Sequence, residues 1–438
     1  MKKWLAIGII LLFVGTCIIP AIAQDIEKSS QPTSRGNWLY VGGSGPGNYS
    51  KIQDAINDSS NGDTVFVYDD SSPYYENVVV NKSIDLVGED RNSTVVDGGR
   101  NGDVVFISAD NISIDGFTIQ NSGDKYDDAG VHLRSNFSIV RNMKIWNDSR
   151  GIYLYHSCNN QVVNNTINQN REEGVVLGFH SDYNMIYGNI IGWLNRVGVE
   201  LLASNMNNTF SYNVIEQNQD EGVILFTSHN NRFLSNTIRR NGQDGIFIHD
   251  SMNNNITKNT INANGGSGVS IQSVASPKNS ILKNTISYNY YGIFFLGISN
   301  TTISENIITG NTYGIGLEGS LNNTILKNFF TENNIAIRLV GSIGTLVSEN
   351  SINGNSEGVN LKDCLKTEIS FNNFQNNSLR NALFFNSSNT LWISNYWNRP
   401  RILPKPIFGV TKIKTYPFFW INFDWHPAQV PYDISEMS

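Results

Sequence analysis

The sequence predicts an all-β solenoid, a single parallel β-helix, and three features of the chain support this fold class. A Gly–Ile or Gly–Val pair recurs every 21 to 24 residues, and an Asn-x-Ile or Asn-x-Phe element keeps step with it. The apolar residues are short, mostly β-branched and alternate with polar ones, as they do in strands. Such self-similarity is typical of units that bury their apolar faces only against their neighbours.

The two series of repeated residues run through most of the chain. The Gly series comprises Gly130, Gly151, Gly174, Gly198, Gly222, Gly245, Gly268, Gly292, Gly314 and Gly358, with Ala336 and Ala382 filling two further places. The Asn series comprises Asn165, Asn189, Asn213, Asn236, Asn259, Asn284, Asn306, Asn328, Asn350 and Asn372. Asn tolerates the left-handed backbone that tight turns require. We therefore expect each Asn at a turn, with its amide in a ladder along the stacked coils.

Other solenoids fit the repeat less well. Helical repeats need amphipathic runs of about ten or more residues, and each unit here holds several Asn and Gly, which are poor helix formers. Leucine-rich repeats need an L-x-x-L-x-L element before the Asn, and it is missing. The stretch 255–273 reads instead as one coil, with short strands on both sides of a turn at Asn259.

The N-terminus predicts export. Two Lys precede an apolar run that ends in an A-x-A-like site, so residues 1–23 read as a signal peptide; an uncleaved membrane anchor is the alternative. Residues 24–36 are polar and aperiodic, as in a disordered linker. We expect a secreted, extracellular or cell-surface protein that contacts membrane only through an uncleaved N-terminal segment.

Three further segments follow the linker. Residues 37–129 form an N-terminal cap and the first coils, with a short helix opened by a capping box from Ser50 to Gln53. Residues 130–397 form the β-helix repeats. Residues 398–438 are rich in Pro and aromatic residues, and we expect this tail to pack back over the last coils.

The repeats and both ends resemble a known group. The N-terminal GDTVFVYDDSSPYYENVVV, the N-x-I…GI coils and the ending NYWNRPRILPKPIFG…FDWHPAQVPYDI are similar to NosD-type repeat proteins of the secreted archaeal type. These belong to the carbohydrate-binding and sugar-hydrolysis (CASH) β-helix proteins, whose PbH1 repeats form a single-stranded, pectate-lyase-like, right-handed parallel β-helix. The resemblance implies that fold over about residues 38–434. The resemblance indicates little about the activity, because proteins with unrelated activities share the fold.

Several functions stay open on the sequence. Charged residues make up 16% of the chain and its net charge is −7, so a nucleic-acid partner is not expected. The first reading is a non-catalytic protein that binds polysaccharide or forms part of the cell envelope. The resemblance also admits a glycan-active lyase or hydrolase, or a NosD-like role in copper binding and maturation. The catalytic motifs of pectin methylesterases and polygalacturonases are absent.

Candidate catalytic groups are the carboxylates just before the Gly of the middle coils. They are Glu173, Glu221 and Asp244. Glu221 and Asp244 fill the same place in adjacent coils, so their backbones should lie about 4.8 Å apart. A close pair of carboxyl groups suits acid and nucleophile roles on a sugar, and it equally suits Ca²⁺ or a solvated acidic rim.

Candidate metal ligands stand in two consecutive coils. His156 and His180 each lie nine residues before a ladder Asn, with Cys158 and Asp182 beside them. Imidazole and thiolate suit Cu or Zn, and the alternative is a polar turn with a free Cys. No cofactor is certain on these grounds.

A possible ligand-binding surface is the outward side of the Gly–Ile/Val strands. Its candidate contacts are Tyr153, Tyr155, Phe226, Phe247 and Phe294, with Val176, Leu202, Ile224 and Leu296 in the same stripe. An exposed apolar stripe of this length needs a partner. Sugar rings, a second copy of the chain, or the C-terminal tail could cover it.

Overall fold

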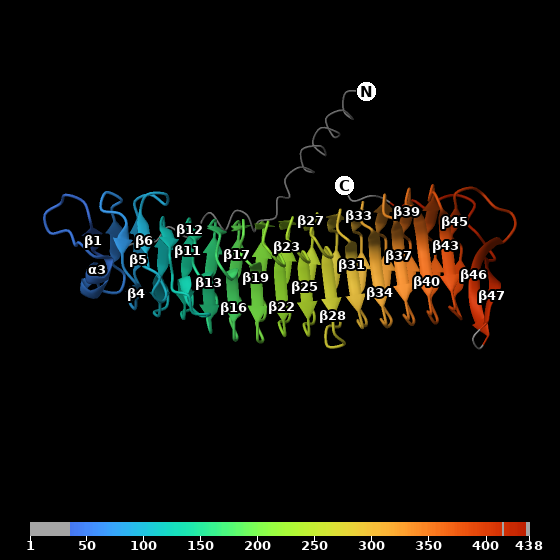
Figure 1. Ribbon diagram of the computed structural model, residues 1–438, viewed down its shortest axis with the longest axis horizontal. Helices are drawn as coiled ribbons and strands as arrows, with labels where there is room; N and C mark the ends of the chain where they lie inside the picture. The colour runs from blue at the N-terminus through green and yellow to red at the C-terminus, as the bar shows by residue number, and fades with distance from the viewer. Residues whose placement is uncertain (1–35, 414–415, 435–438) are drawn as a thin grey trace, which may run out of the picture.

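The protein is a long parallel β-helix in which the chain winds through three stacks of strands (Figure 1). The computed structural model describes residues 36–413 and 416–434. Each coil contributes one strand to each stack, in the order stack 2, stack 3, stack 1, and each strand pairs in parallel with its counterparts in the adjacent coils. This confirms the predicted fold class.

The strands of each stack are as follows. Stack 1 comprises β4 (Val78–Val80), β7 (Val105–Ile107), β10 (Ala129–Leu133), β13 (Arg150–Tyr155), β16 (Glu173–Gly178), β19 (Val197–Leu202), β22 (Val223–Phe226), β25 (Ile246–His249), β28 (Val269–Gln272), β31 (Tyr291–Leu296), β34 (Tyr313–Glu318), β37 (Ile335–Val340), β40 (Glu357–Lys362), β43 (Arg380–Phe385) and β46 (Lys405–Ile413). Stack 2 comprises β1 (Trp38–Val41), β2 (Thr64–Val67), β5 (Asp85–Gly88), β8 (Ser113–Asp115), β11 (Ile139–Arg141), β14 (Gln161–Val163), β17 (Met185–Tyr187), β20 (Thr209–Ser211), β23 (Arg232–Leu234), β26 (Asn255–Thr257), β29 (Ser280–Leu282), β32 (Thr302–Ser304), β35 (Thr324–Leu326), β38 (Leu346–Ser348), β41 (Glu368–Ser370), β44 (Leu391–Ile393) and β47 (Tyr416–Asp424). Stack 3 comprises β3 (Tyr74–Tyr75), β6 (Val95–Asp97), β9 (Thr118–Gln120), β12 (Lys144–Trp146), β15 (Thr166–Asn168), β18 (Ile190–Gly192), β21 (Val214–Glu216), β24 (Thr237–Arg239), β27 (Thr260–Asn262), β30 (Thr285–Ser287), β33 (Ile307–Thr309), β36 (Phe329–Thr331), β39 (Ser351–Asn353), β42 (Asn373–Gln375) and β45 (Tyr396–Trp397).

The core is a set of apolar columns along the axis. Inward residues of the three stacks, such as Val175, Ile186 and Ile191 in one coil, are fully buried. Equivalent residues of adjacent coils stack on one another, and the rings of Phe210 and Phe233 are nearly parallel with centroids 4.8 Å apart. Each coil therefore buries its apolar side chains against the coils before and after it.

The repeated Gly is required by close approach between coils. A Cβ on Gly151 would lie 2.4 Å from the carbonyl oxygen of Gly174 in the next coil. Near the end of the series Val359 pairs with Ala382, so the residue opposite Gly358 is Asn381. The predicted place of Ala382 is thus wrong by one residue, because Asn381 and not the small Ala382 stands at the position of the repeated Gly.

The Asn ladder is present, but its turn geometry differs from the prediction. The amide oxygen of Asn259 accepts hydrogen bonds from the backbone and side-chain nitrogens of Asn236, at 2.8 and 3.0 Å, and its own amide nitrogen donates to the carbonyl of Phe233 at 2.9 Å. The left-handed residue is the one before it, Lys258, with φ of +56°. The buried side chain of each ladder Asn therefore stabilises a turn in which the strained, left-handed residue is the one just before that Asn.

The predicted N-terminal helix is present as α3 (Ile52–Asp58), which buries Ile52, Ala55 and Ile56. The predicted capping box is wrong, because its N-cap has no side-chain hydrogen bond. Both carboxylate oxygens of Glu76 instead accept from the first helical amides, Ile52 at 2.8 Å and Gln53 at 3.0 Å. The cap therefore comes from a residue far away in the sequence.

The C-terminal end is an antiparallel hairpin of β46 and β47, which continues stacks 1 and 2 beyond the last coil (Figure 1). The segment after β47 runs back along the last coils. There the backbone amide of Tyr432 donates to the side chain of Asn373 at 2.9 Å, and its hydroxyl donates to the carbonyl of Ser394 at 2.5 Å. The hairpin does not lie over the apolar stripe of the middle coils.

The predicted signal peptide and almost all of the linker lie outside the described residues. In the ranges that the structure does describe, no helix is long and apolar enough to cross a bilayer.

Candidate functional site

The outer face of stack 1 carries three parallel rows of side chains. Row 1 holds the residue before the repeated Gly, whereas rows 2 and 3 hold alternate residues of the strand that follows it. Strand pairing aligns rows 2 and 3 along the axis, and the same offset between coils places the residues of row 1 in register. Row 1 includes Arg150, Glu173, Val197, Glu221 and Asp244. Row 2 includes His132, Tyr153, Val176, Glu200, Ile224, Phe247 and Phe294. Row 3 includes Tyr155, Gly178, Leu202, Phe226, His249 and Leu296.

The predicted apolar stripe corresponds to rows 2 and 3, and only part of it meets solvent. Tyr153 and Ile224 are 6% and 7% exposed, and Val176 is fully buried. Val176 and Tyr153 pack together with Tyr155 and Leu202 beside them, in a small apolar cluster outside the main core. The stripe is half-buried from Phe226 onward and becomes exposed at Leu296.

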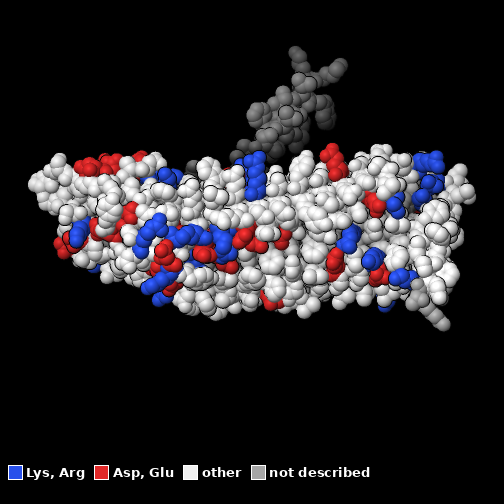
Figure 2. All heavy atoms as spheres, viewed as in Figure 1, with Lys and Arg blue, Asp and Glu red and all other residues white. Residues whose placement is uncertain are grey.

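Charged side chains gather over strands β13, β16 and β19, where Figure 2 shows the blue and red atoms side by side. We call Arg150, Glu172, Glu173, Arg196 and Glu200 the ionic cluster. The Arg150 Nε lies 2.9 Å from one oxygen of Glu173, and Arg196 binds the other oxygen. Arg196 Nε also lies 2.6 Å from Glu172. Glu173 and Arg150 are 0% and 1% exposed, so they form a buried ion pair.

Glu200 lies in the next coil beside this pair and has an unusual protonation equilibrium. Burial and the negative charge of Glu173 together raise the pKa of Glu200 to about 7, although Arg196 and Arg150 partly offset the rise. One Glu200 oxygen is buried and has no hydrogen-bond partner, and neither has one terminal nitrogen of Arg150. The site therefore contains a carboxyl group that can hold or release a proton near neutral pH.

Aromatic side chains surround the ionic cluster. The guanidinium carbon of Arg150 lies 3.9 Å from the ring centroid of Tyr126 and 4.7 Å from that of Tyr153. Tyr126 is 61% exposed, so its ring lies between the buried guanidinium and solvent. The ring of His132 packs against Tyr153 in a tilted arrangement with centroids 4.8 Å apart, and its Nδ1 is 2.9 Å from Asp103.

The three predicted catalytic carboxylates divide into two environments. Both oxygens of Glu173 are occupied by arginines, so Glu173 can act on a ligand only through its neighbours. Glu221 lies in the coil of β22, and Asp244 lies at the equivalent position in the coil of β25. Both side chains are half-buried. Burial raises the pKa of Glu221, and the charges of Asp220 and Asp244 raise it further. Their use in catalysis stays a prediction.

The four predicted metal ligands lie in two adjacent turns. The rings of His156 and His180 are stacked with centroids 6.5 Å apart. The Cys158 sulfur lies 3.4 Å from both the carbonyl of His180 and the amide of Asp182, so backbone groups surround it. Within the described ranges no three His, Cys, Asp or Glu side chains gather as a metal site. Metal binding here stays a hypothesis.

The sequence interpretation missed Arg150, Arg196, Glu200, Tyr126 and His132. A usable signal existed for Arg150, which stands one residue before the repeated Gly, as Glu173 does in the next coil. Opposite charges in equivalent places of adjacent coils predict an axial ion pair. Tyr126 comes from the loop before β10, and no repeat position identifies it.

Comparisons with known proteins agree with this geometry. The family model described as "Right handed beta helix region" matches residues 179–297, and that of "Periplasmic copper-binding protein (NosD)" matches residues 271–414. No curated protein sequence matches the chain.

Solved structures share the fold at low sequence identity. The A-module of mannuronan C-5 epimerase AlgE4 from Azotobacter vinelandii is 16% identical, with 65% of this chain and 92% of that module covered and a TM-score of 0.57. The Dettilon tailspike protein is 14% identical, with 74% and 68% covered and a TM-score of 0.54.

The stacked parallel coils and these matches define a right-handed parallel β-helix repeat protein. Within that class, residues 271–414 of the chain are similar to the NosD family.

The copper ligands that the NosD description implies are not found in the matched segment. Residues 271–414 contain no His and no Met, and their one Cys is Cys364. Cys364 is 2% exposed, takes the place of Ser342 and Ser387 in a column of turn residues, and its amide donates to Ser387 at 3.0 Å. These residues do not fit a copper site, so the similarity lies in the coil architecture.

Proposed function

We propose that the protein binds a polysaccharide across the outer face of stack 1, in an extracellular or envelope location. The observation that carries the proposal is the juxtaposition of aromatic rings and carboxylates on one flat face. The rings of Phe226 and Phe247 are 5.8 Å apart in adjacent coils, and Glu221 and Asp244 lie in row 1 of the same coils.

Both kinds of side chain suit a sugar chain. The apolar faces of sugar rings pack on aromatic rings, and their hydroxyls donate hydrogen bonds to carboxylates. Outward residues recur about every 4.8 Å along the axis, so six coils span roughly 25 Å, the length of a short oligosaccharide. The carboxylates in row 1 and the net charge of −7 favour an uncharged glycan.

The proposal has support from the relatives only at the level of fold. A tailspike protein and a mannuronan C-5 epimerase share the β-helix. The NosD family description places its members in the periplasm. A polysaccharide partner and an envelope location are consistent with these descriptions.

The test is a binding assay with a panel of soluble neutral polysaccharides and polyuronates. We expect a neutral member to bind, and Phe226→Ser with Phe247→Ser to weaken that binding about tenfold to a hundredfold through the loss of two ring contacts. Binding should depend weakly on salt, since few charges would be neutralised. The control is Tyr288→Ser, which removes a ring that is 63% exposed on the stack 3 side.

Three results would count against the proposal. They are the absence of any binding partner in the panel, equal loss in the control variant, and loss of the folded state in the double variant. The same mixtures of protein and polysaccharide should be assayed for new polysaccharide chain ends, which would show cleavage. Cleavage that Glu221→Gln abolishes would favour the glycan-active alternative, in which Glu221 and Asp244 act as a carboxyl pair.

A further inference from the structure

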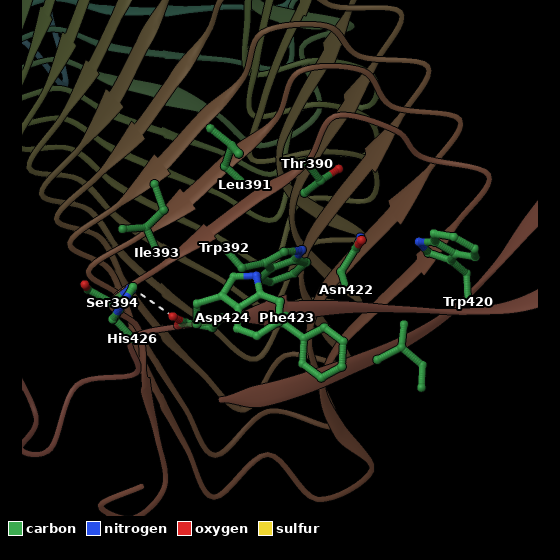
Figure 3. A pocket seen from close by; sticks show the side chains of 12 residues that line it. Thr390, Leu391, Trp392, Ile393, Ser394, Trp420, Asn422, Phe423, Asp424 and His426 are labelled. Atoms are coloured by element: carbon green, nitrogen blue, oxygen red, sulfur yellow. Dashed lines mark hydrogen bonds between the residues drawn. The ribbon is translucent and has the colours of Figure 1, made fainter. Parts of the chain in front are cut away.

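The last coil ends in a pocket that belongs to no part of the stack 1 face. It has a volume of about 440 Å³ and lies between β44, β47 and the residues that follow β47. Figure 3 shows its lining, with Trp392 between Ser394 on one side and Asn422 on the other. This volume is within the range of small-ligand sites.

The pocket forms because most of β47 does not pair with the strand of the last coil. It pairs with β44 only through Trp392 and Asp424, whereas all nine of its residues pair with β46. The buried Asp424 continues the Asn ladder and accepts from the amide of Asn395 at 2.8 Å and from Trp397 Nε1 at 3.0 Å. The floor is therefore held in place, and the Asp424 carboxylate is used by the protein itself.

Two polar groups of the lining, the Thr390 hydroxyl and the Trp392 Nε1–H, are buried without a hydrogen-bond partner. Trp392 is 4% exposed, and its Nε1–H makes no hydrogen bond in the structure. The neighbouring Trp397, also buried, has its Nε1–H satisfied by Asp424. A buried donor without an acceptor destabilises the folded protein, and an acceptor on a ligand would recover that loss.

The mouth of the pocket is aromatic and carries no Lys or Arg. Trp420 and Trp425 are 55% and 63% exposed, and the rings of Phe423 and Trp425 are 5.0 Å apart. Exposed rings beside an unsatisfied hydrogen-bond donor fit a ligand with one apolar face and several oxygen atoms. The lining therefore holds no Lys or Arg side chain that would bind a carboxylate or phosphate.

We propose that this C-terminal pocket binds one sugar unit of a neutral glycan. The sugar ring packs on Trp420, and one of its oxygens accepts the Trp392 Nε1–H. The site is separate from the stack 1 face in both position and residues. The two proposals can therefore fail independently.

The experiment titrates the full chain with neutral hexasaccharides of glucose, mannose and galactose, and with an oligogalacturonate for comparison. Calorimetry and Trp fluorescence report binding. We expect a neutral hexasaccharide to bind, Trp420→Ala to weaken it at least about tenfold, and Trp392→Phe to weaken it about threefold to tenfold, the value of one hydrogen bond.

Two matched variants act as controls. Phe419→Ala removes a ring that is 95% exposed on the same hairpin but does not line the pocket, and it should leave binding unchanged. Phe226→Ser with Phe247→Ser should also leave it unchanged. If Trp392→Phe melts below the assay temperature, Trp420→Ala alone decides, because its side chain is exposed.

Other outcomes would overturn the proposal. They are the absence of binding by every neutral hexasaccharide at millimolar concentration, preference for the oligogalacturonate, or equal weakening by Phe419→Ala. Binding to phosphatidylcholine vesicles that Phe419→Ala abolishes, without sugar binding, would show that the hairpin faces lipid. Self-association lost in Trp420→Ala, again without sugar binding, would show that a second copy of the chain fills the pocket.

Discussion

At the scale of single residues, Glu200 shows how a repeat fold creates an unusual group without a sequence motif. Its position in row 2 places it one coil from Glu173, where the buried side chain of Arg150 and the half-buried side chain of Arg196 both bind Glu173. The polar atoms are brought together by coil stacking, so residues 23 or more apart in sequence share one environment. Burial away from water then raises the pKa of Glu200, the carboxyl group with the fewest partners in the cluster.

The prediction for Glu200 concerns the pH dependence of stability. Its pKa rises from 4.5 to about 7 on folding, so between these values the folded protein holds a proton that the unfolded chain releases. Its contribution to the free energy of unfolding is present below about pH 4.5 and is lost as pH rises through about 7. We expect Glu200→Gln to reduce the fall in stability between pH 5 and 8 by about 2 kcal/mol.

The measurement is urea unfolding at several pH values. Glu349→Gln is the control, since Glu349 forms an exposed pair with Lys327 at 3.5 Å and such pairs contribute little. Equal slopes in the two variants would show that Glu200 is ionised in the folded protein throughout this range.

At the scale of elements, the turn between stacks 2 and 3 shows how strain and hydrogen bonding are divided between two neighbours. The residue before the ladder Asn is left-handed whatever its type, for example Ser235 and Lys258 with φ of +55° and +56°. A left-handed residue other than Gly costs about 1 kcal/mol or more. The hydrogen bonds of the following Asn offset that cost.

The prediction for this turn compares two adjacent substitutions. Asn259→Ala removes the bonds to Asn236, Asn284 and Phe233 and leaves their buried polar groups unsatisfied, so we expect a loss of about 3 to 5 kcal/mol. Lys258→Gly relieves the strained backbone, so we expect a gain of about 0.5 to 1 kcal/mol. Chemical denaturation of both variants measures the difference. A larger loss for the Gly variant would mean that backbone geometry, not the amide ladder, stabilises the turn.

The same elements show what the sequence could predict. The stretch 255–273, expected to form one coil, contains β26, β27 and β28, because inward residues of a repeat must be apolar. The cap on α3 could not be predicted, since Glu76 is 24 residues from Ile52 and meets it only after folding. The ionic cluster was missed for the same reason, while Glu221 and Asp244 were placed in equivalent positions because the register alone determines them.

At the scale of the whole molecule, the structure is close to one-dimensional. Each strand contacts its equivalents in the two adjacent coils, and its stability depends on those neighbours. The ends differ from the middle: α3 covers the first coils, and the β46–β47 hairpin follows the last. Function can then vary along the axis, with a charged face in the middle and an aromatic pocket at one end.

This organisation predicts that one complete coil can be removed. Phe233 pairs with Ile256 and Ile246 pairs with Val269, so every stack has the same 23-residue offset there. Deletion of residues 233–255 joins Arg232 to Ile256 and restores the register of all three stacks. We expect a folded β-rich protein by circular dichroism, with a lower unfolding enthalpy and a pocket that still binds its ligand. Deletion of residues 233–244 is the control, because half a coil moves inward residues to the wrong stack and should prevent folding. If the full-coil deletion also unfolds, distant coils must be coupled, and the nearest-neighbour description of this β-helix is wrong.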